Sequence, residues 1–158
     1  MPMEAATRAD WDMSRCSAAR TLDVVGTRSS LLMMREAFYG TRRFDDFARM
    51  VGVTEAVAAA RLKELVAAGL LERTPYREPG QRTRHEYVLT DRGRDLAPVV
   101  LAMMQFGDRH LAGPDGPPLA LEHAECGDPV RVEVRCSAGH EVGLHELAVR
   151  RGDDPDPG

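Results

Sequence analysis

The fold of this chain is decided by residues 54–90, TEAVAAARLKELVAAGLLERTPYREPGQRTRHEYVLT. Thr54 is a good N-cap and begins a predicted helix, Glu55–Ala68, whose apolar side has helical spacing: Val57 or Ala58, Leu62, Leu65 and Val66. Gly69 ends this helix, because glycine adopts a left-handed backbone without steric cost. After Gly69 the apolar residues no longer recur at helical spacing. Residues 70–76 and 85–90 are predicted strands joined by a polar loop that contains Pro79 and Gly80.

Further helices are predicted on both sides of this stretch. Apolar residues recur at helical spacing over residues 14–26, 29–39 and 43–51, and Ser14 is expected to cap the first of these helices. Gly52 makes a tight turn before Thr54, and a last long helix is expected from Thr90-Asp91 to about Leu111. This order predicts a mostly α protein with a small β-hairpin wing (α+β), a winged helix-turn-helix. A different all-α fold with a stray hairpin is the alternative.

Charge is divided unevenly along the chain, whose formal total is −4. Residues 28–94 hold 13 Lys and Arg against 9 Asp and Glu, whereas residues 95–158 hold 5 against 12. Affinity for phosphate follows the local field of a surface and not the formal total. The asymmetry therefore predicts a basic functional segment followed by an acidic extension.

The composition indicates one compact domain without export or membrane signals. Apolar residues make up 43% of the 158 residues and charged residues 29%, which is ordinary for a globular protein. No apolar run approaches the length of a membrane span, and Asp10, Trp11 and Asp12 stand where an export signal would be apolar. Three widely spaced cysteines favour a reducing compartment. We expect a cytoplasmic protein with no membrane partner and four parts: a flexible N-terminus (1–13), a domain (14–111), a linker (112–120) and an acidic extension (121–158).

Five segments of the domain carry a recognisable pattern: CSAARTLDVVG at 16–26, LLMMREA at 31–37, YGTRRFDDF at 39–47, RLKELVAAGLLER at 61–73 and YVLTDRG at 87–93. Together they resemble the HxlR-type family of transcription regulators over about residues 14–111, in the same order. The resemblance implies a dimeric winged-helix protein that binds DNA, with dimerisation helices at both ends of the domain. The chain departs from the family at Ser29, where Trp is usual, and at Ser17, where proline is usual.

The helix Glu55–Ala68 is expected to enter the major groove of double-stranded DNA, because it follows a helix and a tight turn. Arg61 can bond both O6 and N7 of guanine, and the small side chain of Ala59 permits close approach. The polar candidates beside them are Thr54, Glu55 and Lys63. The alternative is a solvated helix face on which Arg61 and Lys63 pair with Glu64 or Glu55.

The loop between the strands and its edges carry the strongest cationic signal, from Arg77, Gln81, Arg82, Arg84 and His85. A charged hairpin is suited to reaching a DNA backbone or minor groove. Arg42 and Arg43, near the start of the short helix, are placed to hold phosphates. An ordinary solvated hairpin tip is the alternative.

A homodimer is expected, because the last helix carries more apolar surface than a small winged domain covers. The residues predicted for this contact come from the first and last long helices: Leu22, Val25, Val99, Val100, Met103, Met104 and Phe106. Pairing would place two recognition helices about one DNA turn apart, which matches an inverted-repeat operator. Packing of the last helix against residues 17–25 of the same chain is an alternative that is compatible with pairing.

Cys16 is a candidate thiol sensor. It is expected in the first turn of a helix, where the helix dipole favours a thiolate. The resembled family includes members that sense electrophiles or oxidants at the matching cysteine. A buried, inert cysteine is the alternative.

The acidic extension contains two pairs of residues with metal-ligand spacing, His123-x2-Cys126 and Cys136-x3-His140. Four such ligands could hold zinc tetrahedrally in a degenerate zinc-ribbon-like hairpin. The alternative is a small β-hairpin without metal, since residues 130–135 alternate between valine and charged residues.

The sequence contains no nucleophile elbow, phosphate loop, metalloprotease helix or paired-carboxylate motif, so an enzyme is not expected. A winged-helix adaptor that binds protein and not DNA is the competing function. The effector of a DNA-binding regulator could be an oxidant or a small molecule. A small molecule would bind in a cavity between the domain and the dimer helices.

Overall fold

A computed structural model describes residues 13–77, 79–80 and 82–149 of the chain. The described residues fall into two compact units, a main unit of residues 17–131 and a second unit of residues 13–16 with 132–149. The second unit contains two short 3-10 turns, η1 (Met13–Arg15) and η2 (Leu144–Glu146). The α-helices and the hairpin all belong to the main unit.

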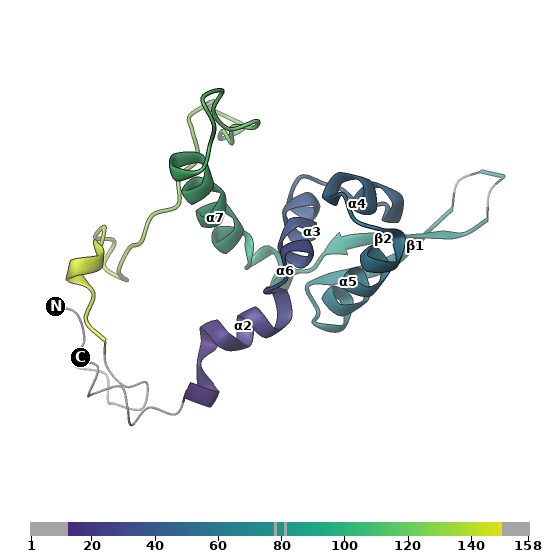
Figure 1. Ribbon diagram of the computed structural model, residues 1–158, viewed down its shortest axis with the longest axis horizontal. Helices are drawn as coiled ribbons and strands as arrows, with labels where there is room; N and C mark the ends of the chain where they lie inside the picture. Colours follow the sequence, from purple (N-terminus) through teal and green to yellow (C-terminus); the bar gives the residue numbers. More distant parts are fainter. Residues whose placement is uncertain (1–12, 78, 81, 150–158) are drawn as a thin grey trace. The chain divides into compact units, whose positions relative to one another are not determined.

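The main unit begins with helices α2 (Ser17–Val25), α3 (Arg28–Phe38), α4 (Phe44–Val51) and α5 (Glu55–Ala67). The hairpin follows, with strands β1 (Leu71–Tyr76) and β2 (Arg84–Leu89). Two more helices complete the unit, α6 (Asp91–Arg94) and α7 (Ala97–His110). Figure 1 shows α3, α4 and α5 grouped at the base of the hairpin. This arrangement confirms the predicted α+β winged helix-turn-helix.

Local signals set the ends of the helix-turn-helix. The Thr54 hydroxyl accepts a hydrogen bond from the Val57 amide at 3.3 Å and so caps α5. Gly52 after α4 and Gly69 after α5 have φ of 70° and 71°, a region that glycine enters without a Cβ clash. The turn therefore forms where the sequence predicts it, and α5 ends one residue earlier than predicted, at Ala67.

The core of the main unit lies between α3, α4, α5 and the start of the hairpin. Met33, Phe47 and Leu62, one from each of these helices, are all 0% exposed. Leu71 of β1 and Val100 of α7 belong to the same buried cluster. Because one core receives side chains from all of these elements, it holds α5 and the hairpin together.

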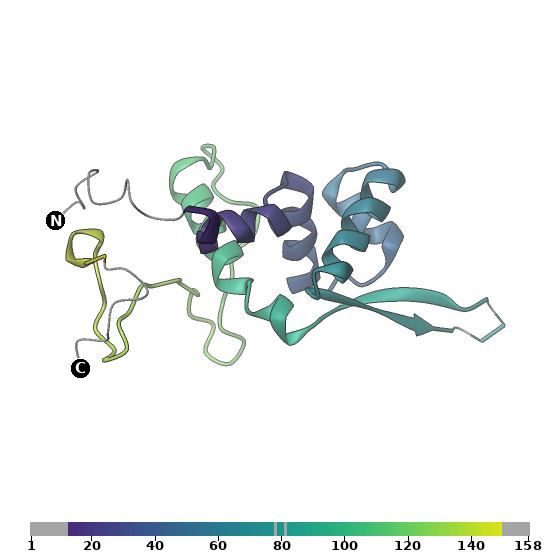
Figure 2. The ribbon, with the colours of Figure 1, turned by 90° about the horizontal axis from the view of Figure 1, so that it is seen from below.

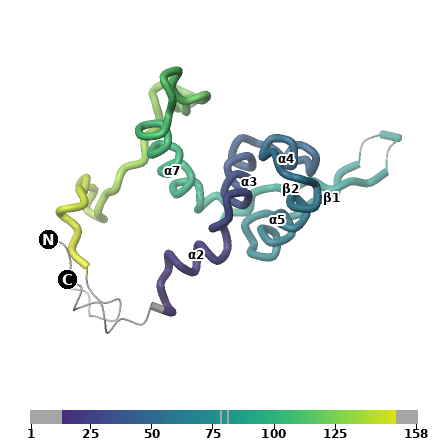
Figure 3. The backbone as a smooth tube through the Cα atoms, in the orientation of Figure 1, coloured from purple at the N-terminus to yellow at the C-terminus, as the bar shows by residue number. Residues whose placement is uncertain are grey.

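The hairpin is extended by a short third piece of chain. The Tyr87 amide of β2 donates to the Arg42 carbonyl at 2.9 Å, and Arg43 forms an isolated antiparallel bridge with Glu86. The segment just before α4 is thus tied to the wing. The tip of the hairpin projects beyond α4 and α5 in two views (Figures 2 and 3).

The last predicted helix is two helices in the structure, so the prediction of one continuous helix is wrong. Thr90 caps α6 as expected, since its hydroxyl accepts from the Gly93 amide at 3.0 Å. An α-helix cannot continue from Arg94, because Pro98 has no amide to donate to the Arg94 carbonyl and its ring clashes there. Helix α7 begins at Ala97 and places Pro98 in its first turn, where the missing amide is harmless.

The start of the chain also differs from the prediction. Ser14 lies in the turn η1 and α2 begins at Ser17, so Ser14 caps no α-helix. Cys16 consequently lies just before α2 and not inside the first turn of a helix. Residues 1–12 of the predicted flexible N-terminus lie outside the described residues.

After α7 the chain returns onto that helix. The Gln105 side-chain amide donates to the Val130 carbonyl at 3.0 Å, and Leu119 and Leu121 line a small cavity with Met104. The main unit therefore extends to residue 131, beyond the predicted linker at residues 112–120.

The expected hairpin in the acidic extension does not form. In the described residues 121–149 the pairing is limited to isolated bridges, Glu122 with Pro129 and Arg135 with Glu141. Val134 is 58% exposed, so the alternating valines bury no common face against a partner strand.

Candidate nucleic-acid interface

Helix α5 buries one side and presents small residues on the other. Ala58, Leu62 and Leu65 are fully buried. Four alanines and one lysine are exposed on α5, together with Glu55, Val57 and Glu64: Ala56, Ala59, Ala60, Ala67 and Lys63. A helix surface made of alanine lets the backbone come close to a partner surface, and Lys63 adds a cation to it.

The N-terminus of α5 is exposed at both predicted residues, Thr54 and Glu55. The Thr54 hydroxyl uses its oxygen to accept from the Val57 amide, so its proton stays available to donate. The first turn of a helix also carries the positive end of the helix dipole, which favours phosphate. Glu55 can accept a hydrogen bond from the amino group of cytosine.

Arg61 has a different environment from the one predicted for a guanine contact. Its side chain is 31% exposed and pairs with Glu64, one turn along α5, at 2.5 Å. Its Nε is buried and has no hydrogen-bond partner in the described part of the chain. This geometry corresponds to the alternative interpretation, in which Arg61 pairs along the helix.

The wing presents the cations that the sequence predicts. Arg77, Arg82, Arg84 and His85 are all exposed, and Gln81 lies outside the described residues. Arg84 and His85 belong to β2, whereas Arg77 and Arg82 lie in the loop. The exposed guanidinium groups sit on an arm that extends from the core.

Arg73 is a wing cation that the sequence analysis missed. It is exposed on β1, and its Nη2 lies 3.1 Å from Nδ1 of His85. The register places Arg73 opposite Tyr87 and Pro75 opposite His85, so Arg73 and His85 are a diagonal pair. The strand was predictable, but the cross-strand register that adds Arg73 to the cluster was not.

Arg42 and Arg43 are tied to the hairpin through their side chains as well as their backbone. The Arg43 guanidinium lies 3.3 Å from the centre of the Tyr76 ring, a cation–π contact. Arg42 is exposed, and its Nη1 lies 3.8 Å from a Glu86 carboxylate oxygen. Arg42 thus keeps an accessible cation near the wing, whereas Arg43 also packs the wing against α4.

A groove of about 720 Å³ separates α4 from the hairpin. Its polar lining mixes both signs of charge, with cations in excess: Arg43, Arg73, Arg84, His85, Asp45 and Asp46. Asp46 also pairs with Arg49. The field in this groove is therefore set mainly by arginine.

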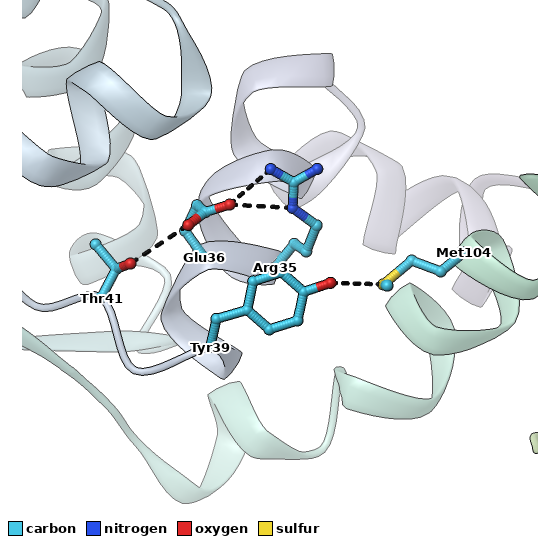
Figure 4. Close-up of polar contacts among 5 residues, drawn as sticks. All are labelled: Arg35, Glu36, Tyr39, Thr41 and Met104. Carbon is cyan, nitrogen blue, oxygen red and sulfur yellow. Dashed lines mark hydrogen bonds and ion pairs between the residues drawn. The ribbon is translucent and has the colours of Figure 1, made fainter. Parts of the chain in front are cut away.

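A buried carboxylate, that of Glu36, is bonded to Thr41, the residue before Arg42 (Figure 4). Glu36 of α3 is 2% exposed; it accepts hydrogen bonds from Arg35 at 2.6 Å and from the Thr41 hydroxyl at 3.3 Å. A buried charge is tolerated only when it is paired and hydrogen-bonded in this way. Glu36 therefore fixes the chain immediately before the two arginines.

Tyr39 connects the same region to α7. Its hydroxyl donates to the Met104 sulfur at 3.5 Å (Figure 4). Partial burial raises the pKa of the Tyr39 phenol, while the Arg35 cation acts in the opposite direction. The end of α3 is thus tied to α7.

The predicted dimerisation residues differ in exposure. Leu22, Val99, Met103 and Phe106 are 61%, 52%, 40% and 60% exposed, so they are available to a partner. Val25 and Val100 are 2% and 0% exposed, so they are core residues and the prediction for them is corrected. Met104 is half-buried.

The correction for Val25 and Val100 has a structural reason. Val25 and Val100 face the core of their own protomer, and a partner chain cannot reach a side chain that is already enclosed. The apolar period of a helix predicts that a stripe is buried, but it does not say which of two adjacent apolar residues points inward.

The cysteines and histidines of the acidic extension form two close pairs. His123 Nδ1 lies 3.2 Å from Cys126 Sγ, and Cys136 Sγ lies 3.6 Å from His140 Nδ1. Among residues 13–77, 79–80 and 82–149, no three metal-ligating side chains are grouped closely enough to hold an ion. Zinc binding stays a prediction.

Cys16 is half-buried.

None of the described helices combines the length and the hydropathy needed to cross a bilayer.

Residues 24–114 match the family described as HxlR-like helix-turn-helix. The chain is 41% identical, over 90% of its length and 85% of the relative, to the Uncharacterized HTH-type transcriptional regulator Rv3095 of Mycobacterium tuberculosis. It superimposes on the crystal structure of PA1607, described as a transcription factor, with a TM-score of 0.78 and 33% identity, covering 92% of this chain and 99% of that one. The redox regulator HypR in its oxidised form matches with a TM-score of 0.56 and 31% identity, covering 62% of this chain and 100% of that one. The chain belongs to the HxlR-like helix-turn-helix family of transcriptional regulators.

Proposed function

We propose that this protein is a homodimeric regulator that binds a specific inverted-repeat operator in double-stranded DNA. The observation that carries the proposal is the exposed surface of α5, which includes four alanines and Lys63, followed along the chain by an arm of exposed arginines. Both the exposed surface of α5 and the arginine arm are accessible in the single protomer. The regulators to which the chain is similar support the same role.

The roles divide between base and backbone contacts. The N-terminal part of α5 enters the major groove, where Thr54 and Glu55 reach base edges and Ala59 allows a close approach. Lys63, Arg42 and the wing cations contact phosphates, which supply affinity but little sequence information. Arg61 takes a smaller part than the sequence suggests, because Glu64 occupies its guanidinium.

The dimer forms through α2 and α7. Leu22, Val99 and Phe106 are large apolar side chains more than half exposed in the single chain. Burying such surface against a second copy is favourable, by about 25 cal/mol per Å². A twofold pair of α5 helices then faces two half-sites about one DNA turn apart.

Fluorescence anisotropy with DNA from upstream of the gene tests this function. We expect Arg77→Gln, Arg82→Gln and Arg84→Gln, combined, to weaken binding at least tenfold and to flatten its salt dependence, because about three phosphate contacts are lost. Arg109→Gln, an exposed arginine on α7, is the matched control and should bind like the parent protein. Equal affinity of the triple variant and the parent would contradict the proposal and favour a protein-binding adaptor.

Redox control through Cys16 is a second part of the proposal. It is supported by the similarity to the redox regulator HypR and by the position of Cys16 immediately before α2, the helix assigned to the dimer contact. Oxidation or alkylation at this position would alter the start of that helix.

The exposed cysteines Cys126 and Cys136 must be removed to test Cys16 alone. In the Cys126→Ser/Cys136→Ser protein, we expect peroxide to change DNA affinity at least threefold and dithiothreitol to reverse the change. The additional Cys16→Ser substitution should abolish the response. An unchanged affinity of the double variant after stoichiometric oxidation of Cys16, verified by mass spectrometry, would end the redox proposal.

We further propose that the protein acts in the cytoplasm without catalysing a reaction. Its membership of a regulator family supports this role.

A further inference from the structure

A pocket of about 600 Å³ lies between α2, the end of α5 and the α6–α7 region. This volume is in the range of small-molecule sites. Its apolar lining includes Val25, Leu70 and Leu96, which are only 2%, 5% and 9% exposed. Because these residues belong to the protomer's own core, the apolar floor of the pocket is complete in a single chain.

Two arginines from different helices line the same pocket. Arg20 of α2 and Arg92 of α6 are both exposed. In the described part of the chain neither guanidinium has an ion-pair partner, although the neighbouring Arg94 pairs with Asp91 at 3.6 Å. Asp95 also lines the pocket and pairs with neither arginine. The pocket thus combines a buried apolar floor with two unpaired cations.

We propose that this pocket binds an organic anion, a carboxylate or sulfonate attached to an apolar body of one or two rings. A guanidinium holds such a group through two parallel hydrogen bonds, and two guanidinium groups outweigh the single charge of Asp95. The apolar body occupies the floor formed by Val25, Leu70 and Leu96.

Arg92 lies close to the end of α5, so a ligand bound to Arg92 can affect that helix. Helix α6 is bonded to the end of α5, because the Thr90 hydroxyl donates to the Gly69 carbonyl at 2.6 Å. Arg92 lies over the same glycine: a Cβ at Gly69 would stand 3.9 Å from Arg92 Nη1. Gly93 approaches Leu70 so closely that a Cβ would lie 2.1 Å from its carbonyl oxygen. A ligand held by Arg92 therefore acts on the C-terminal end of α5.

This assignment rests on the proposed function, since it makes the pocket the effector site of a DNA-binding regulator. Binding itself does not depend on DNA. It is therefore measured first on the full-length protein alone, so that a failure of the pocket is distinguishable from a failure of DNA binding.

The probe is 1-anilinonaphthalene-8-sulfonate, and N-phenyl-1-naphthylamine supplies the same ring system without the charge. We expect saturable fluorescence with one sulfonate dye per chain. Arg20→Gln with Arg92→Gln should weaken that dye about tenfold or more, because charge-assisted hydrogen bonds are lost, and should leave the neutral dye unaffected. Arg28→Gln, an exposed arginine of α3 outside the pocket, is the matched control.

Two results would overturn the assignment: equal affinity of the sulfonate dye for the double variant and the parent, or equal affinity of the parent for the two dyes. Arg20→Lys with Arg92→Lys retains both charges and should recover part of the binding, which guards against a loss caused by misfolding. The dye should also shift the DNA affinity of the parent protein at least threefold, and an unchanged DNA affinity at saturating dye would refute the effector role.

Discussion

Helices α5 and α7 have nearly the same length, 13 and 14 residues, but present opposite surfaces to solvent. Helix α5 encloses Leu62 and Leu65, and its exposed apolar residues are four alanines and Val57. Helix α7 encloses Val100 and leaves Val99 and Phe106 outside. Helix α5 buries both of its leucines within the protomer, whereas α7 leaves large apolar side chains exposed.

Each helix therefore suits a different kind of partner. An outward surface of alanine offers little apolar area but lets a backbone approach closely, as a DNA groove requires. An outward surface of valine, methionine and phenylalanine is costly in water and is relieved by another apolar surface. If each helix takes the partner proposed for it, the protomer separates DNA binding from dimerisation by the size of the outward side chains.

Substitutions on the enclosed side of α5 should be the most damaging to the protein. Leu62→Ala should lower the free energy of unfolding by about 2–5 kcal/mol, because a fully buried side chain leaves a cavity. Urea denaturation followed by circular dichroism measures it. Val57→Ala, a partly exposed position on the same helix, should cost less than about 1 kcal/mol. Equal losses at the two positions would mean that α5 is not anchored as described.

The next effect concerns the outward side of α7. Val99→Asp with Phe106→Asp should raise the dimer dissociation constant at least a hundredfold, because each side chain loses apolar burial of about 1.5–3 kcal/mol. Sedimentation velocity measures the change. Arg109→Asp, on the same helix, should remain dimeric. A double variant that still sediments as the parent does would place the dimer contact elsewhere.

A smaller effect is expected on the outward side of α5. Ala60→Leu should weaken DNA binding at least tenfold with an unchanged melting temperature, because the longer side chain holds the helix away from the bases. Ala67→Leu, exposed at the other end of the helix, is the matched control. Anisotropy titrations compare the two, and similar affinities would show that α5 does not enter the groove by its N-terminal half.

The smallest effect is at the Arg61–Glu64 pair. Glu64→Gln should change the free energy of unfolding by at most about 0.5 kcal/mol, because a partly exposed ion pair within one helix contributes little. The measurement is again urea denaturation. A loss well above about 1 kcal/mol would indicate that the pair supports the fold and not merely the orientation of Arg61.

Features with local causes were predictable from the sequence. Thr54 and Thr90 cap helices because a short hydroxyl side chain reaches the amide three residues ahead, and Gly52 and Gly69 end helices because they lack a Cβ. The cationic wing was predictable too, since its arginines cluster in a loop. Pro98 gave a local signal for the break between α6 and α7 that the prediction of one long helix overlooked.

Features that depend on tertiary packing were not predictable. Helical period does not decide that Val100 is enclosed while Val99 is exposed, because the two are adjacent in the sequence and both are apolar. The stacking of Arg43 on Tyr76 requires the hairpin to fold back toward α4. Two roles were foreseen for Arg61, a guanine contact or an ion pair with Glu64, and the sequence does not decide between them because helical spacing allows both.

Hydroxyl-radical footprinting of the full-length protein on DNA upstream of its own gene would reveal directly whether a symmetric dimer binds two half-sites. If exposed α5 surfaces are presented twice by a symmetric dimer, two protected tracts should appear with centres about 10 base pairs apart and inverted sequences beneath them. Uniform cleavage of that DNA, at protein concentrations where the dimer is fully formed, would contradict the account.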